Sequence, residues 1–256
     1  MARAVSCVIP ARLASSRFPG KMLLPLLGSP LIIHTLRRAQ EADCFDEVIC
    51  FTDARVIRDE VEGAGFKACL TGPAANGTER IGKYVDLIKN DLVVNLQGDE
   101  PAFPPQALRL LAHALTLEPA KVHVLVEEHQ ARAHDLANPN RCKAGLDATG
   151  HILDFYRREP RVPIHESRLQ LGAYGYYKDF LRKYAELVPS AVEQSESHEL
   201  LRDIGLAQVR GHLCPYASQA VDVPQDAELA LALLQRGFPG DPIADTLALA
   251  RLAGRG

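Results

Sequence analysis

The stretch IPARLASSRFPGK, residues 9–21, carries three cations around a Pro-Gly turn, Arg12, Arg17 and Lys21. Arginine offers forked donors and lysine a point charge, and both side chains bind phosphate groups. The stretch matches neither the GxxxxGK[ST] nor the GxGxxG pattern of common nucleotide-binding loops. These residues alone leave two interpretations open: a phosphate-binding loop, and a solvated basic loop whose side chains form surface salt bridges.

The stretch NLQGDEPAFP, residues 95–104, places Asp99 and Glu100 directly after an apolar run. Carboxylate oxygens in such a position suit Mg²⁺ bound to a triphosphate. The alternative is a capped turn in which Gly98 and Asp99 serve backbone geometry.

Two further stretches precede predicted helices. In AANGTERIG, residues 74–82, Gly77 at a helix start permits a ligand to approach closely, and ordinary capping by Asn76 is the alternative. In QAVDVPQD, residues 219–226, Asp222 is either a helix N-cap or a second metal-binding carboxylate.

Strands and helices that would position these stretches alternate through the first part of the chain. Apolar runs predict strands at 4–9, 47–52, 67–71 and 91–97, and periodicity predicts helices at 29–42, 54–65 and 77–89. Ser29 is the expected N-cap of helix 29–42, with Pro30 at the first helical position. Apolar strands in this order predict a parallel sheet covered on both faces, with ligands bound beyond the strands' carboxyl ends. The first three stretches each follow one of these strands, so they are expected to lie at one edge of the sheet and to share one site.

The second half of the chain predicts more strands and helices in a less regular order. Helices are expected at 104–118, 190–205, 222–237 and 241–254, strands at 121–129 and 206–213, a hairpin at 140–158, and a strand running into a helix at 169–187. The predicted organisation is one domain, 1–256, with an inserted antiparallel lobe at about 104–180 and an extra C-terminal helix at 238–256.

Composition excludes several classes of protein. The chain has 256 residues, 47% of them hydrophobic, and a net charge of −3, which argues against a nucleic-acid partner. No apolar run reaches the length of a membrane span, and no secretory signal is present at the N-terminus. The six cysteines form no CxxC pair. A reduced, cytoplasmic protein is the expectation.

Six stretches taken together resemble one family. PARLASSRFPGK, NGTERI, NLQGDEP, NPNRCKAGLDATG, LGAYGYY and VDVPQDAE occur in the order found in bacterial CMP-Kdo synthetases (3-deoxy-manno-octulosonate cytidylyltransferases). The resemblance covers about residues 1–235. It implies a Rossmann-like α/β nucleotidyltransferase fold with a mostly parallel sheet, a homodimer joined through the antiparallel lobe, and a Mg²⁺-dependent reaction. In that reaction CTP and a small anionic acceptor form a CMP-sugar and pyrophosphate.

The same resemblance implies roles for individual residues. The expected catalytic residues are Arg12, Lys21, Asp99 and Asp222, of which Asp99 and Asp222 would hold magnesium. The expected nucleotide-binding residues are Pro10, Ala11, Arg12, Ser15, Arg17, Lys21, Asn76, Gly77, Thr78, Arg80 and Asp99. The expected acceptor-binding residues are Gln97, Arg157, Gln170, Tyr174, Glu199 and Leu200.

Two departures from the family pattern fall among the residues expected to face the acceptor. Gln170 occupies a position where the family has histidine, and Leu200 replaces a glutamine. Losing an amide at a site built for a polyol alters specificity. Arg157 still aligns and is expected to hold the acceptor's carboxylate. The hypothesis is a cytidylyltransferase whose acceptor is not standard Kdo but a modified ulosonic acid or another small acid.

Other functions stay open at this point. A nucleotidyltransferase that uses UTP on a sugar phosphate shares the fold but usually begins with a GxGTR-like loop, which is absent. A non-catalytic nucleotide-binding relative is the second alternative, although a decayed enzyme would be expected to lose some of Lys21, Asp99 and Asp222. A purely structural protein gives no reason for polar loops at the strand ends.

Overall fold

The computed structural model describes residues 3–15 and 17–236. Its strands are β1 (Val5–Ala11), β2 (Pro25–Leu26), β3 (Ser29–Pro30), β4 (Glu47–Thr52), β5 (Lys67–Leu70), β6 (Leu92–Leu96), β7 (Val122–Gln130), β8 (Lys143–Leu146), β9 (His151–Tyr156), β10 (Glu166–Tyr177) and β11 (Val209–Cys214). Its α-helices are α1 (Leu31–Glu41), α2 (Arg55–Gly63), α3 (Gly77–Lys83), α4 (Pro105–Leu117), α5 (Ala133–Ala137), α6 (Lys178–Glu186), α7 (Ala191–Glu196), α8 (Leu200–Leu206) and α9 (Pro224–Arg236). The helix expected at 238–256 lies outside the described residues. Within them, no helix has the length and apolarity needed to cross a membrane.

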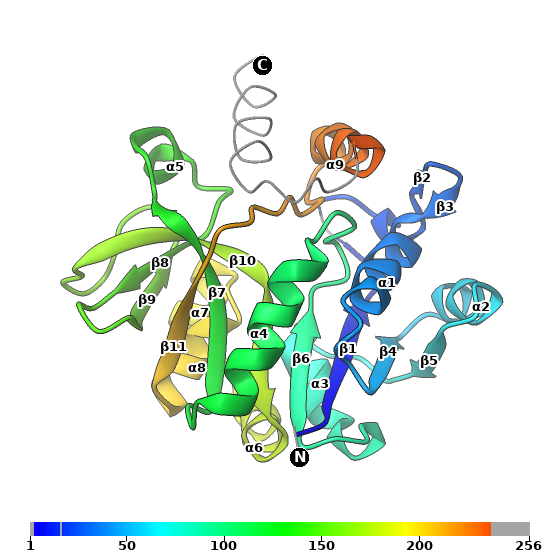
Figure 1. Cartoon of the computed structure of the whole chain (residues 1–256), viewed down its shortest axis with the longest axis horizontal. Helices are drawn as coiled ribbons and strands as arrows, with labels where there is room; N and C mark the ends of the chain where they lie inside the picture. Colours follow the sequence, from blue (N-terminus) through cyan, green and yellow to red (C-terminus); the bar gives the residue numbers. More distant parts are fainter. Residues whose placement is uncertain (1–2, 16, 237–256) are drawn as a thin grey trace.

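A nine-stranded mixed sheet, in the order β5-β4-β1-β6-β10-β7-β11-β9-β8, forms the centre of the protein (Figure 1). Its first four strands are parallel, as the apolar runs predicted. Strand β10 is antiparallel to β6 along its second half, whereas its first residues pair with β8. The residues expected to form an inserted lobe therefore extend the same sheet, and β10 joins its two parts.

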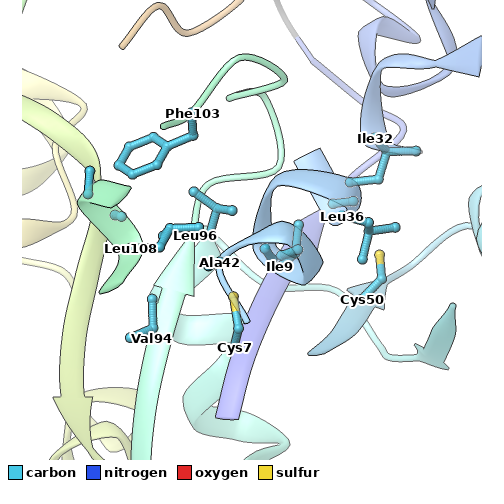
Figure 2. Packing of buried hydrophobic residues seen from close by; sticks show 14 of the residues in the cluster. Cys7, Ile9, Ile32, Leu36, Ala42, Cys50, Val94, Leu96, Phe103 and Leu108 are labelled. Atoms are coloured by element: carbon cyan, nitrogen blue, oxygen red, sulfur yellow. The ribbon is translucent and has the colours of Figure 1, made fainter. Parts of the chain in front are cut away.

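Each face of the sheet carries its own apolar cluster. Successive strand side chains point to opposite faces, so Cys7 and Ile9 of β1 pack on the side of α1 and α4, and Val8 packs on the side of α3 and α6. Figure 2 shows the first cluster, where Ile32 and Leu36 of α1 lie against the strands. The predicted sheet with two covered faces is confirmed.

The start of α1 differs from the prediction. Strands β2 and β3 form a small hairpin in which Leu26 lies opposite Ser29, so Ser29 belongs to a strand. Pro30 is the N-cap residue, and the Leu31 N–H donates to the carbonyl of Leu24 at 2.8 Å. The predicted N-cap at Ser29 is wrong, because Ser29 lies in β3 and its hydroxyl accepts from Arg37 Nη1 at 3.2 Å.

The helix predicted at 190–205 is broken into α7 and α8. Ser190 caps α7 as expected, accepting a hydrogen bond from the Glu193 N–H at 3.1 Å. Ser197 then adopts a left-handed conformation with φ of 51°, which ends the helix. The break turns His198 and Glu199 towards the cavity described below. The helix predicted at 77–89 also ends early, at Lys83.

Candidate active site

A cavity of about 810 Å³ collects most of the predicted site residues. It is lined by side chains that follow β1 and β6, by the start of α3, and by β10 and the α7–α8 break. The predicted residues in its wall are Pro10, Ala11, Arg12, Ser15, Arg17, Lys21, Asn76, Gly77, Arg80, Gln97, Asp99, Arg157, Gln170, Tyr174, Glu199 and Asp222. The prediction that ligands bind beyond the carboxyl ends of the parallel strands agrees with this position.

One end of the cavity holds a cluster of opposite charges. Lys21 Nζ donates to Asp99 Oδ2 at 2.6 Å and to the Val221 carbonyl at 2.8 Å. The same Nζ forms an ion pair with Asp222 Oδ1 at 3.4 Å, and Arg17 Nη2 donates to that oxygen at 2.9 Å. Three distant parts of the sequence therefore meet at one point, and Lys21 is only 7% exposed.

The Asp222 side chain faces Lys21 and Arg17, two residues before α9 begins at Pro224. Asp226 Oδ2 accepts hydrogen bonds from the N–H groups of Asp222 and Val223, both at 2.9 Å. The interpretation of Asp222 as a helix N-cap is wrong, because α9 begins two residues later and the Asp222 carboxylate accepts from Arg17 and Lys21 instead of from helix N–H groups. Its carboxylate instead joins the charged cluster.

Arg12 is exposed and lines the same cavity. Within the described part of the chain it forms no hydrogen bond or ion pair. A guanidinium in this state can donate to a bound phosphate without first breaking an internal contact.

Glycines allow the loops of this site to approach each other. A Cβ on Gly98 would lie 2.6 Å from the Pro10 carbonyl oxygen, and one on Gly77 would lie 2.9 Å from Pro10 Cγ. The ends of β1 and β6 and the start of α3 therefore meet more closely than side chains would permit.

The loop before α3 is held by its own polar contacts. Asn76 Oδ1 accepts from the Glu79 N–H at 2.8 Å, which confirms the capping interpretation, and Asn76 Nδ2 donates to Glu193 Oε1 at 3.2 Å. Arg80 is 2% exposed and forms an ion pair with Asp53 at 2.7 Å. This loop is a rigid edge of the cavity.

Two predicted site residues lie behind the wall. Thr78 is 0% exposed, and its hydroxyl accepts a hydrogen bond from Asn95 Nδ2 at 3.0 Å. Leu200 is also 0% exposed and packs in the cluster of α3 and α6, because the first residue of α8 turns towards the sheet. Neither side chain reaches the cavity. This corrects the expectation that the Thr78 side chain contacts the nucleotide and that the Leu200 side chain contacts the acceptor.

The side chains expected to bind the acceptor form hydrogen bonds within the protein. Gln170 Nε2 donates to the Leu171 carbonyl at 2.8 Å and to the Tyr174 hydroxyl at 2.7 Å. Gln97 Nε2 donates to Glu199 Oε1 at 2.9 Å. The Arg157 guanidinium donates only to backbone carbonyls within the described residues, among them that of Asn140 at 3.0 Å. Its positive charge therefore meets no carboxylate there.

Cys142 and His198 also line the cavity, and sequence reasoning missed both. Cys142 Sγ lies 3.2 Å from His198 Nε2. Burial, then the charges of Arg157 and Arg161, lower the pKa of His198 to about 3, and burial raises the pKa of Cys142 to about 12. The pair is neutral at pH 7. The two residues are far apart in sequence, so no local pattern joins them.

Glu100 is the third carboxyl group at the charged end. It is 3% exposed, and burial together with Asp99 and Asp222 raises its pKa to about 8. A Cβ on Gly172 would lie 2.2 Å from Glu100 Oε1, so the glycine of LGAYGYY makes room for this carboxyl. The sequence showed Glu100 beside Asp99 but gave it no separate role.

The charged end fits a magnesium ion bound together with a triphosphate. No group of three or more His, Cys, Asp or Glu side chains in the described ranges is arranged to hold a metal by itself. Magnesium on a nucleotide usually takes one or two carboxylates and completes its shell with phosphate oxygens and water. Asp99 and Asp222, which converge on one lysine, supply that number.

A sheet of this kind, with cations after β1, Asp99 after β6 and Asp222 before α9, suits the class of nucleotidyltransferases. A family model described as "Cytidylyltransferase" matches residues 6–211. The chain is 39% identical over 245 residues to a 3-deoxy-manno-octulosonate cytidylyltransferase of Myxococcus xanthus, covering 89% of this chain and 95% of the relative. The chain belongs to the cytidylyltransferase family, in its 3-deoxy-manno-octulosonate (CMP-Kdo synthetase) branch, as the six stretches indicated.

Other relatives agree with this assignment. A 3-deoxy-manno-octulosonate cytidylyltransferase of an Anaeromyxobacter species is 35% identical over 249 residues, covering 92% of this chain and 98% of the relative. A solved CMP:2-keto-3-deoxy-manno-octonic acid synthetase complexed with CTP has a TM-score of 0.81 and 32% identity, covering 91% of this chain and 99% of that one. A cytidylyltransferase from Leptospira borgpetersenii, at 14% identity and a TM-score of 0.65 over 98% and 96% of the two chains, shares the fold.

Proposed function

We propose that this cytidylyltransferase transfers CMP from CTP to the hydroxyl group of an acidic sugar of the ulosonic-acid class, releasing pyrophosphate. The observation that carries the proposal is the charged cluster. Lys21, Arg17, Asp99 and Asp222 meet at one end of a cavity large enough for a nucleotide and a second substrate. The CTP-bound solved relative supports CTP as the nucleotide.

The chain's own residues supply charge and position. The acceptor oxygen forms a bond to the α-phosphorus while the bond to the β-phosphate oxygen breaks, and the hydroxyl proton passes to solvent. Negative charge builds on the leaving pyrophosphate, so cations fixed in advance lower the barrier. Arg12, Arg17 and Lys21, which all line the cavity, would supply these cations.

Asp99 and Asp222 would hold magnesium when the nucleotide is bound. The ion would screen the phosphate charges and increase the acidity of a hydroxyl bound to it. Lys21, now paired with both carboxylates, would then be directed towards the phosphates.

The residues at the acceptor end suit an anionic acceptor. Arg157 carries the charge that would receive the acceptor's carboxylate, while His198 stays neutral beside it. A Kdo-like ulosonic acid is the first candidate acceptor. A small acid with fewer hydroxyls is the second, because the Gln170 N–H groups are already used by Leu171 and Tyr174 and are not offered to a polyol.

A pyrophosphate-release screen tests the proposal. Four nucleoside triphosphates are combined with ulosonic acids and small acids, phosphonates included, with and without Mg²⁺. The expected result is release that requires CTP, an acid and the metal together. Release with UTP and a sugar phosphate, or none with any pair, would refute it.

Homodimerisation and a cytoplasmic location belong to the same proposal. Both follow from the family resemblance and stay predictions. Light scattering after size-exclusion chromatography would give the mass in solution, and a mass of one chain would contradict the dimer.

A further inference from the structure

Glu199 contacts both the loop expected to bind nucleotide and a residue expected to bind the acceptor. It lies on the α7–α8 break, beside residues expected to bind the acceptor. Its Oε1 accepts from Gln97 Nε2 at 2.9 Å, and its Oε2 accepts from the Thr78 N–H at 3.0 Å. One carboxylate therefore joins the end of β6 to the first turn of α3.

The Thr78 contact concerns the loop expected to bind nucleotide. The first N–H groups of a helix have no partner within that helix. In α3, the Glu79 N–H is satisfied by Asn76, and the Thr78 N–H is satisfied by Glu199. The position of Gly77 and Asn76 in the cavity wall thus depends on a side chain that comes from more than a hundred residues away.

Glu199 has no salt bridge among the described residues, so hydrogen bonds alone hold its carboxylate. Hydrogen bonds from N–H groups to a carboxylate are stronger than those between neutral groups. Glutamine would be a poor substitute, because an amide has one acceptor oxygen and its NH₂ group would face one of two donors.

We propose that Glu199 is a positioning residue for the nucleotide, holding the α3 loop and Gln97 in register so that CTP affinity depends on a residue of the acceptor wall. The inference rests on the proposed function only in taking CTP as the nucleotide. Since α7 is also bonded to this loop, through Glu193 and Asn76, the α7–α8 segment supports both the α3 loop and Gln97.

The test measures the Kd of CTP by calorimetry with MgCl₂ and no acceptor. Glu199→Gln is expected to weaken CTP binding roughly tenfold to fiftyfold, the loss expected for one hydrogen bond to a charged group. The exposed Glu186 of α6 provides the matched control, because Glu186→Gln makes the same charge change away from the cavity and should bind CTP like the wild type.

A swap distinguishes positioning from a general loss of structure. In Gln97→Glu/Glu199→Gln, the new amide oxygen can accept from Thr78 and the new NH₂ can donate to the carboxylate at position 97. The double variant should recover most of the CTP affinity lost by Glu199→Gln. If Glu199→Gln does not fold in a thermal scan, Glu199→Asp, which keeps the charge but is too short to reach both donors, should show the same weakening.

Three results would overturn the inference. The first is a CTP affinity of Glu199→Gln within twofold of the wild type, the second is a swap that binds CTP no better than Glu199→Gln, and the third is a change confined to the KM of the acceptor. Wild-type protein that does not bind CTP would instead refute the proposed function, so the two failures are distinguishable.

Discussion

The two ends of the cavity are built in different ways. At the charged end, side chains from three parts of the sequence pair directly with one another, Lys21 with Asp99 and Asp222, and Arg17 with Asp222. At the acceptor end, Gln170, Gln97 and Arg157 are bonded to neighbouring amides, a hydroxyl, a carboxylate and backbone carbonyls. The first arrangement suits a chemistry common to a family. In the second arrangement, a change in a few contacts can alter which acceptor the enzyme uses.

The largest effect is expected at the charged end. Lys21→Met removes a cation from the leaving group and leaves Asp99 and Asp222 without their shared partner, so kcat/KM should fall about 10²–10³-fold. Steady-state pyrophosphate release measures it. Lys89→Met, at an exposed lysine, is the control and should keep full activity. A loss of less than tenfold in a folded Lys21→Met protein would contradict this role.

A smaller and more selective effect is expected at Arg157. Arg157→Lys keeps a charge but loses the forked donors, so the KM of the acid should rise roughly thirtyfold while CTP affinity stays within twofold. Initial rates at saturating CTP give the KM, and Arg158→Met at an exposed arginine is the control. If Arg157→Lys weakened CTP binding as much as it raised the KM of the acid, Arg157 would not be a residue specific to the acceptor.

These two predictions rest on different amounts of sequence information. The strands and their edge were predictable, because apolar runs and the polar residues that follow them are local signals. The parallel order predicted that Lys21 and Asp99 lie at one edge of the sheet, whereas Asp222 was assigned to the same site only by the family resemblance. The role of Asp222 was not predictable from its place near α9, because only the structure shows Asp226 accepting the N–H groups of Asp222 and Val223 while the Asp222 carboxylate turns to Lys21 and Arg17.

The acceptor end was predicted less well, and one residue explains much of the error. Ser197 takes a left-handed conformation that is uncommon for serine, and it breaks a helix that periodicity predicted as continuous. The break buries Leu200 and brings His198 and Glu199 to the cavity. The hypothesis of a changed acceptor now depends on Gln170, because Leu200 does not face the ligand.

Gln170→His tests that hypothesis, with a modest expected effect. If the wild type discriminates against Kdo, restoring the family's histidine should raise kcat/KM for Kdo about three- to tenfold. Pyrophosphate release with Kdo and with the best small acid, compared between the two proteins, gives the ratio. Wild-type turnover of Kdo at a rate usual for the family would refute the hypothesis.

The smallest effect concerns stability. The pKa of His198 is lowered to about 3, so between pH 6.5 and 3 the unfolded chain binds a proton that the folded chain excludes, and stability falls as pH falls through this range. In the His198→Gln variant, the side chain at position 198 binds no proton in the unfolded chain. Between pH 6 and 5 the wild type should lose about 1 kcal/mol more unfolding free energy than the variant. Urea unfolding at both pH values measures the difference, and parallel losses would show that His198 is charged in the folded protein.

The most direct test of the central claim follows the α-phosphate of CTP. The protein is incubated with α-labelled CTP, Mg²⁺ and a ulosonic acid, and the products are separated. The account predicts that the label appears in an acid-linked CMP product in the wild type, and is greatly reduced in Asp222→Asn. Label that stays in CTP with every acid, or that appears as free CMP without an acceptor, would contradict it.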